Sequence, residues 1–304
     1  DTLFHHILPA AVAEFNPQID YWHSSPSAGM GKLSNYDNTA GDMHYWGVWH
    51  GKEPFKNYKS NVGRFMVEYG FQSFPSMKTI KRFASDSSFS FDSETMKNRQ
   101  KSYIGNGLIS KHIDTWFNKP TSFEDFVLKS QKTQTIALQT AIQSHRKQSP
   151  HCMGTLFWQL NDCWPAVSWS SMDGLGNWKA LQYHAKKAFE NVIISTAQTE
   201  KNVAIYVVND TFAEVKNTLV ISHLDFDGNT LFEEKNAFNS PINSSEIAFN
   251  YDISNREFVK ENSFLKLTYG DAESYHYFSK PKNLNLKNQP LDIEIKENNE
   301  GFLI

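Results

Sequence analysis

The 304-residue chain has little cysteine, no long apolar run and no surplus of positive charge. Its two cysteines, Cys152 and Cys163, flank an apolar run that we expect to be extended. At about 3.3 Å per extended residue, the two thiols would lie beyond the roughly 7 Å limit for a disulfide. We therefore predict free thiols. No segment approaches the roughly 18 apolar residues of a membrane span, so we expect no membrane partner.

The charge balance argues against another class of partner. Lys+Arg 30 against Asp+Glu 33 gives a net charge of -3. A protein that binds nucleic acid needs a surplus of cations to displace counterions from the phosphates, so we expect no nucleic-acid partner. The sequence starts at Asp1, without an initiator Met or a signal-peptide pattern, and we expect it to be cut from a longer protein. Localisation in periplasm, lysosome or cytoplasm stays open, as does the oligomeric state.

Aromatic residues make up 14% of the chain, and none of its eight tryptophans lies beyond Trp178. Large aromatic side chains are first of all core fillers. Their concentration in one part of the chain, beside polar residues, also suits the stacking of sugar rings. The aromatic content alone leaves a packed core and a carbohydrate site as two open interpretations.

Residues 1–194 have the texture of an α/β protein. Short apolar runs that end in polar, aromatic loops predict strands at 19–22, 42–49, 63–69 and 154–160. A helix is expected over 121–147, where residues 121–124 resemble a capping box, and another over 179–190. Four such strands make half of a (β/α)8 TIM barrel, so we predict the C-terminal half of a TIM-barrel catalytic domain. A half barrel would expose its edges, and its expected partner is the missing N-terminal half of the same protein.

The texture changes after about residue 194. Short alternating runs separated by turn residues predict an immunoglobulin-like antiparallel β-sandwich of about seven strands over 195–282. The tail, 283–304, is rich in Pro, Asn, Lys and Glu, and we expect a linker or the start of a further domain. The predicted fold class is therefore α/β plus all-β.

The segment 63–75 carries the densest chemistry. An apolar strand ends there in the lone carboxylate of Glu68, followed by a glycine-containing turn. Catalytic residues of parallel barrels lie at the carboxyl ends of the strands, so Glu68 is a candidate nucleophile or proton carrier. The alternative interpretation is a salt bridge between Glu68 and Arg64 or Lys78.

Two further segments resemble the first. Trp158 ends another apolar run, and it would face the barrel mouth if Glu68 does. In 41–50, alternation places Asp42, His44 and Trp46 on one face. The spacing of histidines and acids fits no zinc or two-metal template, so we expect neither a metal nor a cofactor.

These motifs carry a family resemblance. The sequence EYGFQSFP at 68–75 resembles the nucleophile strand of β-mannosidases of glycoside hydrolase family two. WQLND at 158–162 resembles their eighth strand, and SSP at 24–26 and GDMH at 41–44 resemble their fifth and sixth. The resemblance covers roughly residues 20–190, in order. The later sandwich is similar to the family's mannosidase-type immunoglobulin-like domain.

The resemblance implies a retaining double displacement on terminal β-D-mannose, with Glu68 as the nucleophile. It implies that Trp158 forms the floor of the sugar subsite and precedes a cis peptide bond to Gln159. Further substrate-binding residues are expected to be Trp46, His50 and Gln72, although a turn role for Gln72 fits as well. Tyr45, His50 and Tyr69 compete to hold the nucleophile, and we assign that role to none.

A retaining enzyme also needs an acid/base carboxyl, which in this family is the Glu of an Asn-Glu pair. No such pair in a suitable context precedes Glu68, so we expect it upstream of Asp1, and we expect the fragment alone to be inactive. The expected substrate is a β-mannoside oligosaccharide. The alternatives are an exo-β-glucosaminidase or β-galactosidase of the same family, or a non-catalytic carbohydrate-binding fragment.

Overall fold

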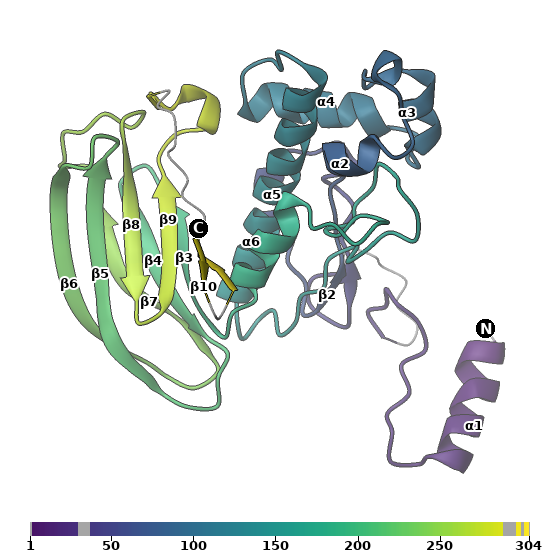
Figure 1. The fold of residues 1–304 in the computed structure, drawn as a ribbon. Helices are drawn as coiled ribbons and strands as arrows, with labels where there is room; N and C mark the ends of the chain where they lie inside the picture. Colours follow the sequence, from purple (N-terminus) through teal and green to yellow (C-terminus); the bar gives the residue numbers. More distant parts are fainter. Residues whose placement is uncertain (1, 30–36, 288–295, 299–300, 304) are drawn as a thin grey trace.

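The computed structural model describes residues 2–29, 37–287, 296–298 and 301–303. Two parts lie side by side in Figure 1, a helix-rich region built from the first 190 residues and a β-sandwich built from the residues that follow. Each part has its own apolar core. The chain therefore combines a mixed helix-and-strand region with an immunoglobulin-like sandwich.

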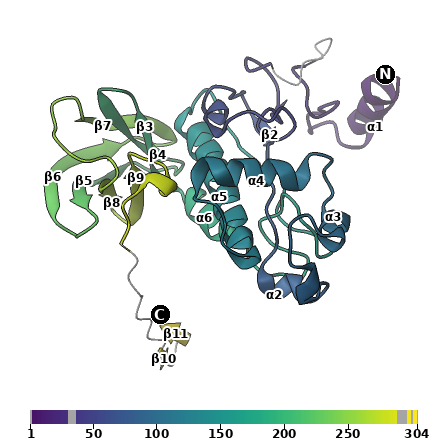
Figure 2. The ribbon, with the colours of Figure 1, turned by 90° about the horizontal axis from the view of Figure 1, so that it is seen from above.

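Helices dominate the first region. Its α-helices are α1 (Leu8–Phe15), α2 (Met77–Ile80), α3 (Glu94–Arg99), α4 (Gly105–Trp116), α5 (Phe123–Lys147) and α6 (Ala180–Ala188). Shorter turns are the π-helix η1 (Leu3–Ile7) and the 3-10 helices η2 (Phe55–Lys59) and η3 (Asp86–Ser88). Figures 1 and 2 both show α1 apart from the rest, and neither η1 nor α1 has a buried residue.

Helix α5 organises this region, and the predicted helix over 121–147 is confirmed within two residues. The helix begins after Ser122, whose side chain accepts a hydrogen bond from the Asp125 backbone N–H. The Asp125 carboxylate accepts in return from the backbone N–H of Thr121. This arrangement is a variant of the capping box with its cap at Ser122, one residue later than expected, in which the returning carboxylate bonds the residue before the cap. Basic residues in the last turn interact favourably with the negative, C-terminal end of the helix dipole.

Strands are shorter here than the sequence suggests. β1 (Met43–His44) and β2 (Met66–Glu68) form a parallel pair, in agreement with only part of each prediction, near the start of 42–49 and in the second half of 63–69. The strand predicted over 154–160 is reduced to a single parallel bridge between Thr155 and Met66. The strand predicted over 19–22 is wrong, because a strand needs a neighbouring backbone, and in the described residues the first bridge of this segment is made by Ser27. The half-barrel stays a prediction.

The sandwich has long, regular strands. They are β3 (Val192–Gln198), β4 (Asn202–Asn209), β5 (Val215–Asp225), β6 (Thr230–Ser240), β7 (Ser244–Asp252), β8 (Ser263–Tyr269) and β9 (Ala272–Tyr277). One sheet has the order β3-β4-β7 and the other β6-β5-β8-β9, with antiparallel pairing throughout. The predicted antiparallel sandwich is confirmed.

Alternation explains why the two sheets pack together. Along β8 every second side chain is buried, so Leu265 and Leu267 point inward while Lys266 points out. They meet Ile205 and Val207 of β4 from the opposite sheet. After the 3-10 helix η4 (Pro281–Asn283), the short strands β10 (Lys296–Asn298) and β11 (Gly301–Leu303) pair antiparallel. The division at residue 194 and the nature of the tail stay predictions.

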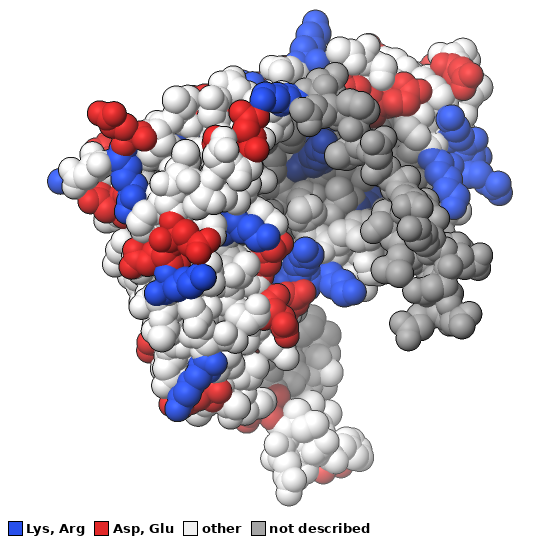
Figure 3. Space-filling view, turned by 60° about the vertical axis from the view of Figure 1, so that its left-hand side comes forward, with Lys and Arg blue, Asp and Glu red and all other residues white. Residues whose placement is uncertain are grey.

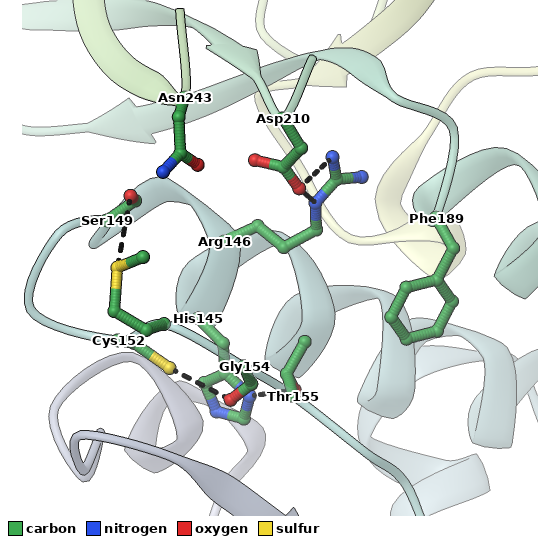
Figure 4. Close-up of a pocket in the computed structure, with 10 residues that line it drawn as sticks. His145, Arg146, Ser149, Cys152, Gly154, Thr155, Phe189, Asp210 and Asn243 are labelled. Atoms are coloured by element: carbon green, nitrogen blue, oxygen red, sulfur yellow. Dashed lines mark hydrogen bonds and ion pairs between the residues drawn. The ribbon is translucent and has the colours of Figure 1, made fainter. Parts of the chain in front are cut away.

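The two parts meet at the C-terminal end of α5. Arg146 is buried and donates from Nε and Nη2 to one carboxylate oxygen of Asp210 in the sandwich, at 3.1 and 2.7 Å. Its Nη1 donates to the carbonyl of Ala188 at the end of α6. Figure 4 shows this ion pair on the wall of a cavity of about 340 Å³ that His145 and Cys152 also line. One buried arginine thus ties together the last two helices and the sandwich.

The surface and the thiols agree with the composition. Acidic and basic side chains are interspersed on the face shown in Figure 3. Among the described residues, no helix combines the length and apolar character that crossing a bilayer requires. Both cysteines are free, as predicted, with Cys152 buried and Cys163 exposed.

Candidate active site

Glu68 is the last residue of β2, and its neighbour across the parallel pair is His44, the last residue of β1. The two side chains therefore leave the same end of the small sheet. The Glu68 side chain keeps 29% of its surface exposed, and His44 keeps 18%. A strand-end carboxylate with this exposure is fixed by its neighbours but remains open to a ligand.

Two side chains contact the Glu68 carboxylate, and both meet the same oxygen. Trp46 Nε1 donates to Glu68 Oε2 at 3.2 Å, and His44 Nδ1 lies 3.3 Å from Oε2. Within the described residues, neither Arg64 nor Lys78 forms an ion pair with Glu68. The structural alternative raised by the sequence, a salt bridge to one of these two cations, is therefore not what the structure shows.

A second layer of polar residues orients His44. Its Nε2 lies 3.0 Å from Ser25 Oγ, and Ser25 in turn donates to Asp42 Oδ2. The other oxygen of Asp42 accepts from Trp22 Nε1 at 2.9 Å and from the Ser27 backbone N–H at 3.0 Å. The continuous series Asp42, Ser25, His44, Glu68 fixes the imidazole so that Nδ1 faces the carboxylate.

Two indole rings and the backbone of a third tryptophan meet around Gly70, two residues after Glu68. A Cβ atom at Gly70 would lie 2.4 Å from the Trp158 carbonyl oxygen, 3.0 Å from the Trp169 ring and 3.2 Å from the Trp46 ring. Only glycine fits there, and its absence of a side chain lets the three tryptophans approach. Trp158 remains 43% exposed. The peptide bond between Trp158 and Gln159 is cis, as predicted.

Beneath the carboxylate lies a buried polar series. The hydroxyl of Tyr69 lies 2.7 Å from Thr155 Oγ1, which lies 2.8 Å from His145 Nδ1 on α5. Burial raises the pKa of the Tyr69 hydroxyl well above its usual value and lowers the pKa of His145 to about 3. Both groups are therefore neutral near pH 7, and they act here as fixed hydrogen-bonding supports rather than as proton carriers.

Comparison with known proteins gives the site a context. Residues 201–283 match the family described as Mannosidase Ig/CBM-like domain. A "Beta-mannosidase B" of Aspergillus clavatus is 35% identical over 176 residues, which are 56% of this chain and 21% of that protein. One of Aspergillus niger is 29% identical over 208 residues, covering 67% of this chain and 24% of that protein. The chain thus spans about a fifth to a quarter of the length of these relatives.

A solved β-D-mannosidase from Dictyoglomus thermophilum superimposes with a TM-score of 0.88 at 28% identity, over 94% of this chain and 36% of that chain. The resemblance of this chain to β-mannosidases of glycoside hydrolase family two is confirmed. An exo-chitosanase from Amycolatopsis orientalis aligns less well, with a TM-score of 0.54 at 20% identity over 71% of this chain and 27% of that one. That second likeness shows a shared fold alone.

Not every residue that the β-mannosidase resemblance suggested meets Glu68 directly. His50 packs edge-on against Trp46, with ring centroids 5.3 Å apart, and stacks on Tyr103. Gln72 is fully buried, and its amide has no hydrogen-bond partner among the described residues. The roles of Trp46, Trp158, His50 and Gln72 in substrate binding stay predictions.

Of the three residues that competed to hold the nucleophile, Tyr45 donates its hydroxyl to Glu53, and Tyr69 reaches Thr155. The side chain found against Glu68 beside Trp46 is His44, which the sequence interpretation did not name as a site residue. The alternation of Asp42, His44 and Trp46 was the signal for it. That shared face is confirmed, since His44 and Trp46 both contact Glu68 and Asp42 reaches it through Ser25.

The support of the loop after Trp158 was also missed. Gln134 of α5 donates to the carbonyl oxygens of Phe71, Trp169 and Ser170 and accepts from Ser73. No sequence pattern announces such contacts, because they join residues far apart in the chain. No cluster of three or more potential metal-ligating side chains occurs in the described part of the chain.

Proposed function

We propose that this chain is the nucleophile-bearing part of a retaining exo-β-mannosidase, which removes terminal β-D-mannose residues from oligosaccharides. The observation that carries the proposal is the Glu68 carboxylate, held by Trp46 and His44 at the end of β2, where the rings of Trp46 and Trp169 and the backbone of Trp158 meet around Gly70. The β-mannosidase names of the relatives support mannose as the sugar. In the same proposal, residues 1–194 are the second half of a (β/α)8 barrel.

Trp46 and His44 both contact Oε2 of the carboxylate, and this decides which oxygen would react. Trp46 Nε1 and His44 Nδ1 fix Oε2, while Oε1 has no hydrogen bond to any other described residue. Oε1 is therefore the attacking oxygen. It forms a bond to the anomeric carbon as the bond to the leaving oxygen breaks, which gives a covalent glycosyl-enzyme.

The departing oxygen takes a proton from a second carboxyl group. Water, activated by the same carboxylate, then cleaves the glycosyl-enzyme with net retention, and retaining enzymes place the two carboxyls about 5 to 5.5 Å apart. Asp42 is a poor candidate because its oxygens already accept from Trp22, Ser25 and Ser27. We assign the acid/base role to a Glu outside this chain, and propose that residues 1–304 alone do not turn over substrate.

Trp158 supplies the surface for the sugar. Trp158 is 43% exposed although its backbone N–H is bonded to the carbonyl of Tyr69, the residue after the nucleophile. A flat apolar ring face fixed beside the nucleophile suits the C–H face of a mannose ring. Trp46 contributes a second wall while it holds Glu68.

The test uses the full-length protein. Incubation with 2-deoxy-2-fluoro-β-mannosyl fluoride, digestion and peptide mass spectrometry should place a single mannosyl adduct on Glu68. Glu68→Gln should lower kcat/KM on an aryl β-mannoside by on the order of a thousandfold or more, because the nucleophile is lost. Glu124→Gln, an exposed carboxyl in the first turn of α5, is the matched control and should leave activity unchanged. An adduct on any other residue would refute the assignment of the nucleophile.

A further inference from the structure

A second cleft lies away from Glu68, on the outer side of the helices. It has a volume of about 370 Å³ and lies between η2, the end of α4, the middle of α5 and the start of the segment after the sandwich. Clefts of this size accommodate ligands of one or two rings. Its rim carries the exposed lysines Lys52, Lys56, Lys59, Lys111 and Lys280.

The floor of the cleft is a stack of aromatic rings. Phe55 is buried between His112, at a centroid distance of 4.5 Å and 3° between planes, and Trp116, at 5.7 Å and 16°. The Lys280 ammonium lies 5.4 Å from the centroid of the Trp116 ring. The stack holds the His112 ring rigidly where it lines the cleft.

His112 is the observation that points to a ligand. It is only 5% exposed, yet neither of its ring nitrogens has a hydrogen-bond partner in the described part of the chain. Leaving a buried polar group unpaired costs about 1–3 kcal/mol. Burial lowers the pKa of His112 to about 4, so near pH 7 the ring offers one donor and one acceptor. A ligand hydroxyl group, which is both a donor and an acceptor, can pair with either nitrogen but with only one of them at a time.

The rim adds positive charge without internal compensation. Within the described residues none of the five rim lysines takes part in an ion pair, and the carboxylate of Glu53, the residue after Lys52, already accepts from Tyr45 and Asn57. Five like charges around a concave apolar floor concentrate positive potential, although the chain as a whole carries a net charge of -3. The cleft therefore favours an anion.

Two threonine hydroxyls on the wall of the cleft further restrict the kind of ligand that fits. Thr115 donates to the Lys111 carbonyl and Thr140 to the Ile136 carbonyl, so both hydroxyls can only accept from a ligand. The ligand must then carry hydroxyl donors, a face that suits an apolar floor and a negative charge. We propose that this lysine-rimmed cleft binds an acidic saccharide, one that bears a carboxylate or a sulfate, at a site separate from Glu68.

Calorimetric titration of the full-length protein with four probes tests the proposal. Digalacturonate and galactose 6-sulfate represent the two acidic groups, galactobiose is the neutral match, and sodium sulfate is the anion without a sugar. At least one acidic sugar should bind about tenfold or more tightly than either galactobiose or sulfate. Its affinity should fall as NaCl is raised, since the rim charges are exposed.

Two variants locate the binding. The double variant Lys56→Glu and Lys111→Glu should reduce the affinity by about tenfold or more, while Lys132→Glu on the exposed side of α5 should not. His112→Phe keeps the stack but removes both nitrogens, so it should weaken binding while the melting temperature stays equal or rises. Equal affinity for inorganic sulfate, equal affinity for galactobiose, no binding of either acidic sugar, or binding insensitive to these variants would each overturn the proposal.

Discussion

The two regions of this molecule are held together in different ways. In the sandwich, backbone ladders join strand to strand over most of their length, and the core is apolar. Around Glu68 only β1 and β2 pair, and the chain that carries Trp158 and Trp169 has isolated bridges instead of strands. The difference shows that the site is built on irregular backbone rather than on regularly paired strands. Side chains must therefore supply the hydrogen bonds that the backbone groups of this region need.

Helix α5 supplies much of that support. Gln134, which is fully buried, bonds the carbonyls of Phe71, Trp169 and Ser170, while Ser130 Oγ accepts from the backbone N–H of Phe74. On the other side of the loop, the Lys179 ammonium donates to the carbonyls of Ser73 and Ser168. Burial lowers the pKa of Lys179 to about 7, with the charges of Asp162 and Asp173 opposing that shift.

The largest expected effect comes from removing the central support. Gln134→Leu leaves the buried carbonyls of Phe71 and Ser170 and the Ser73 hydroxyl without their Gln134 partner, while the Trp169 carbonyl keeps the Gln159 N–H. Each lost partner costs about 1–3 kcal/mol. We expect a loss of about 4 kcal/mol, confined to the region of the site. Hydrogen exchange of the full-length protein should quicken for peptides covering 71–74 and 168–171, and stay unchanged in β5 and β8.

The matched control is Lys132→Leu, two residues earlier on the exposed side of the same helix. Surface substitutions of this kind usually stay within about 0.5 kcal/mol. If Gln134→Leu and Lys132→Leu gave the same exchange, the support attributed to Gln134 would be refuted.

A smaller loss of stability, confined to the other region, is expected from a substitution in the sandwich core. Leu267→Ala removes a fully buried side chain of β8 that packs between the two sheets, at a cost of about 3 kcal/mol. Exchange should quicken in β5, β8 and β9 but not in the peptides around Glu68. Lys266→Ala, on the outer face and in an exposed ion pair with Glu273, should change little. Faster exchange around Glu68 in Leu267→Ala would show that the two cores are not independent.

The same contrast explains how far the fold could be predicted. The helix over 121–147 and the sandwich strands follow from local patterns, apolar spacing, a capping box and alternation, which each segment carries within itself. The strands over 19–22 and 154–160 failed because strand formation there depends on which backbone lies alongside. That neighbour is distant in sequence and leaves no local signal.

In the candidate site, too, the features that have a local sequence pattern could be predicted and those that depend on distant residues could not. Glu68 and the Trp158 cis bond followed from motifs that resemble β-mannosidases, and the shared face of His44 and Trp46 followed from alternation. Gln134 and Thr155 carry no such signal, since each acts on a backbone or side chain tens of residues away. The segments that carry the candidate site residues were thus predictable, while the network that fixes them was not.

One buried histidine in each region allows the two regions to be compared by their response to acid. In the sandwich, both nitrogens of His223 are bonded, to Tyr251 and Ser263. In the site region His145, which lines the cavity of Figure 4, bonds Thr155 through Nδ1, while its buried Nε2 has no partner among the described residues. Burial lowers the pKa of His145 to about 3, and burial with the charge of Arg256 lowers that of His223 to about 4.

Each imidazole makes its own region sensitive to acid. At pH values between the ordinary histidine pKa near 6.5 and the lowered pKa, the unfolded chain binds a proton on this imidazole and the folded chain does not. The free energy of unfolding therefore decreases by about 1.4 kcal/mol for each pH unit that the pH is lowered. His145→Gln should flatten this slope only for α5 and the site peptides, and His223→Gln only for β5 and β8, in hydrogen exchange at pH 7, 6 and 5. An unchanged slope in His145→Gln would mean that His145 is not kept neutral by the fold. A slope that flattens in both regions with either variant would mean that the tie between Arg146 and Asp210 makes them unfold as one unit.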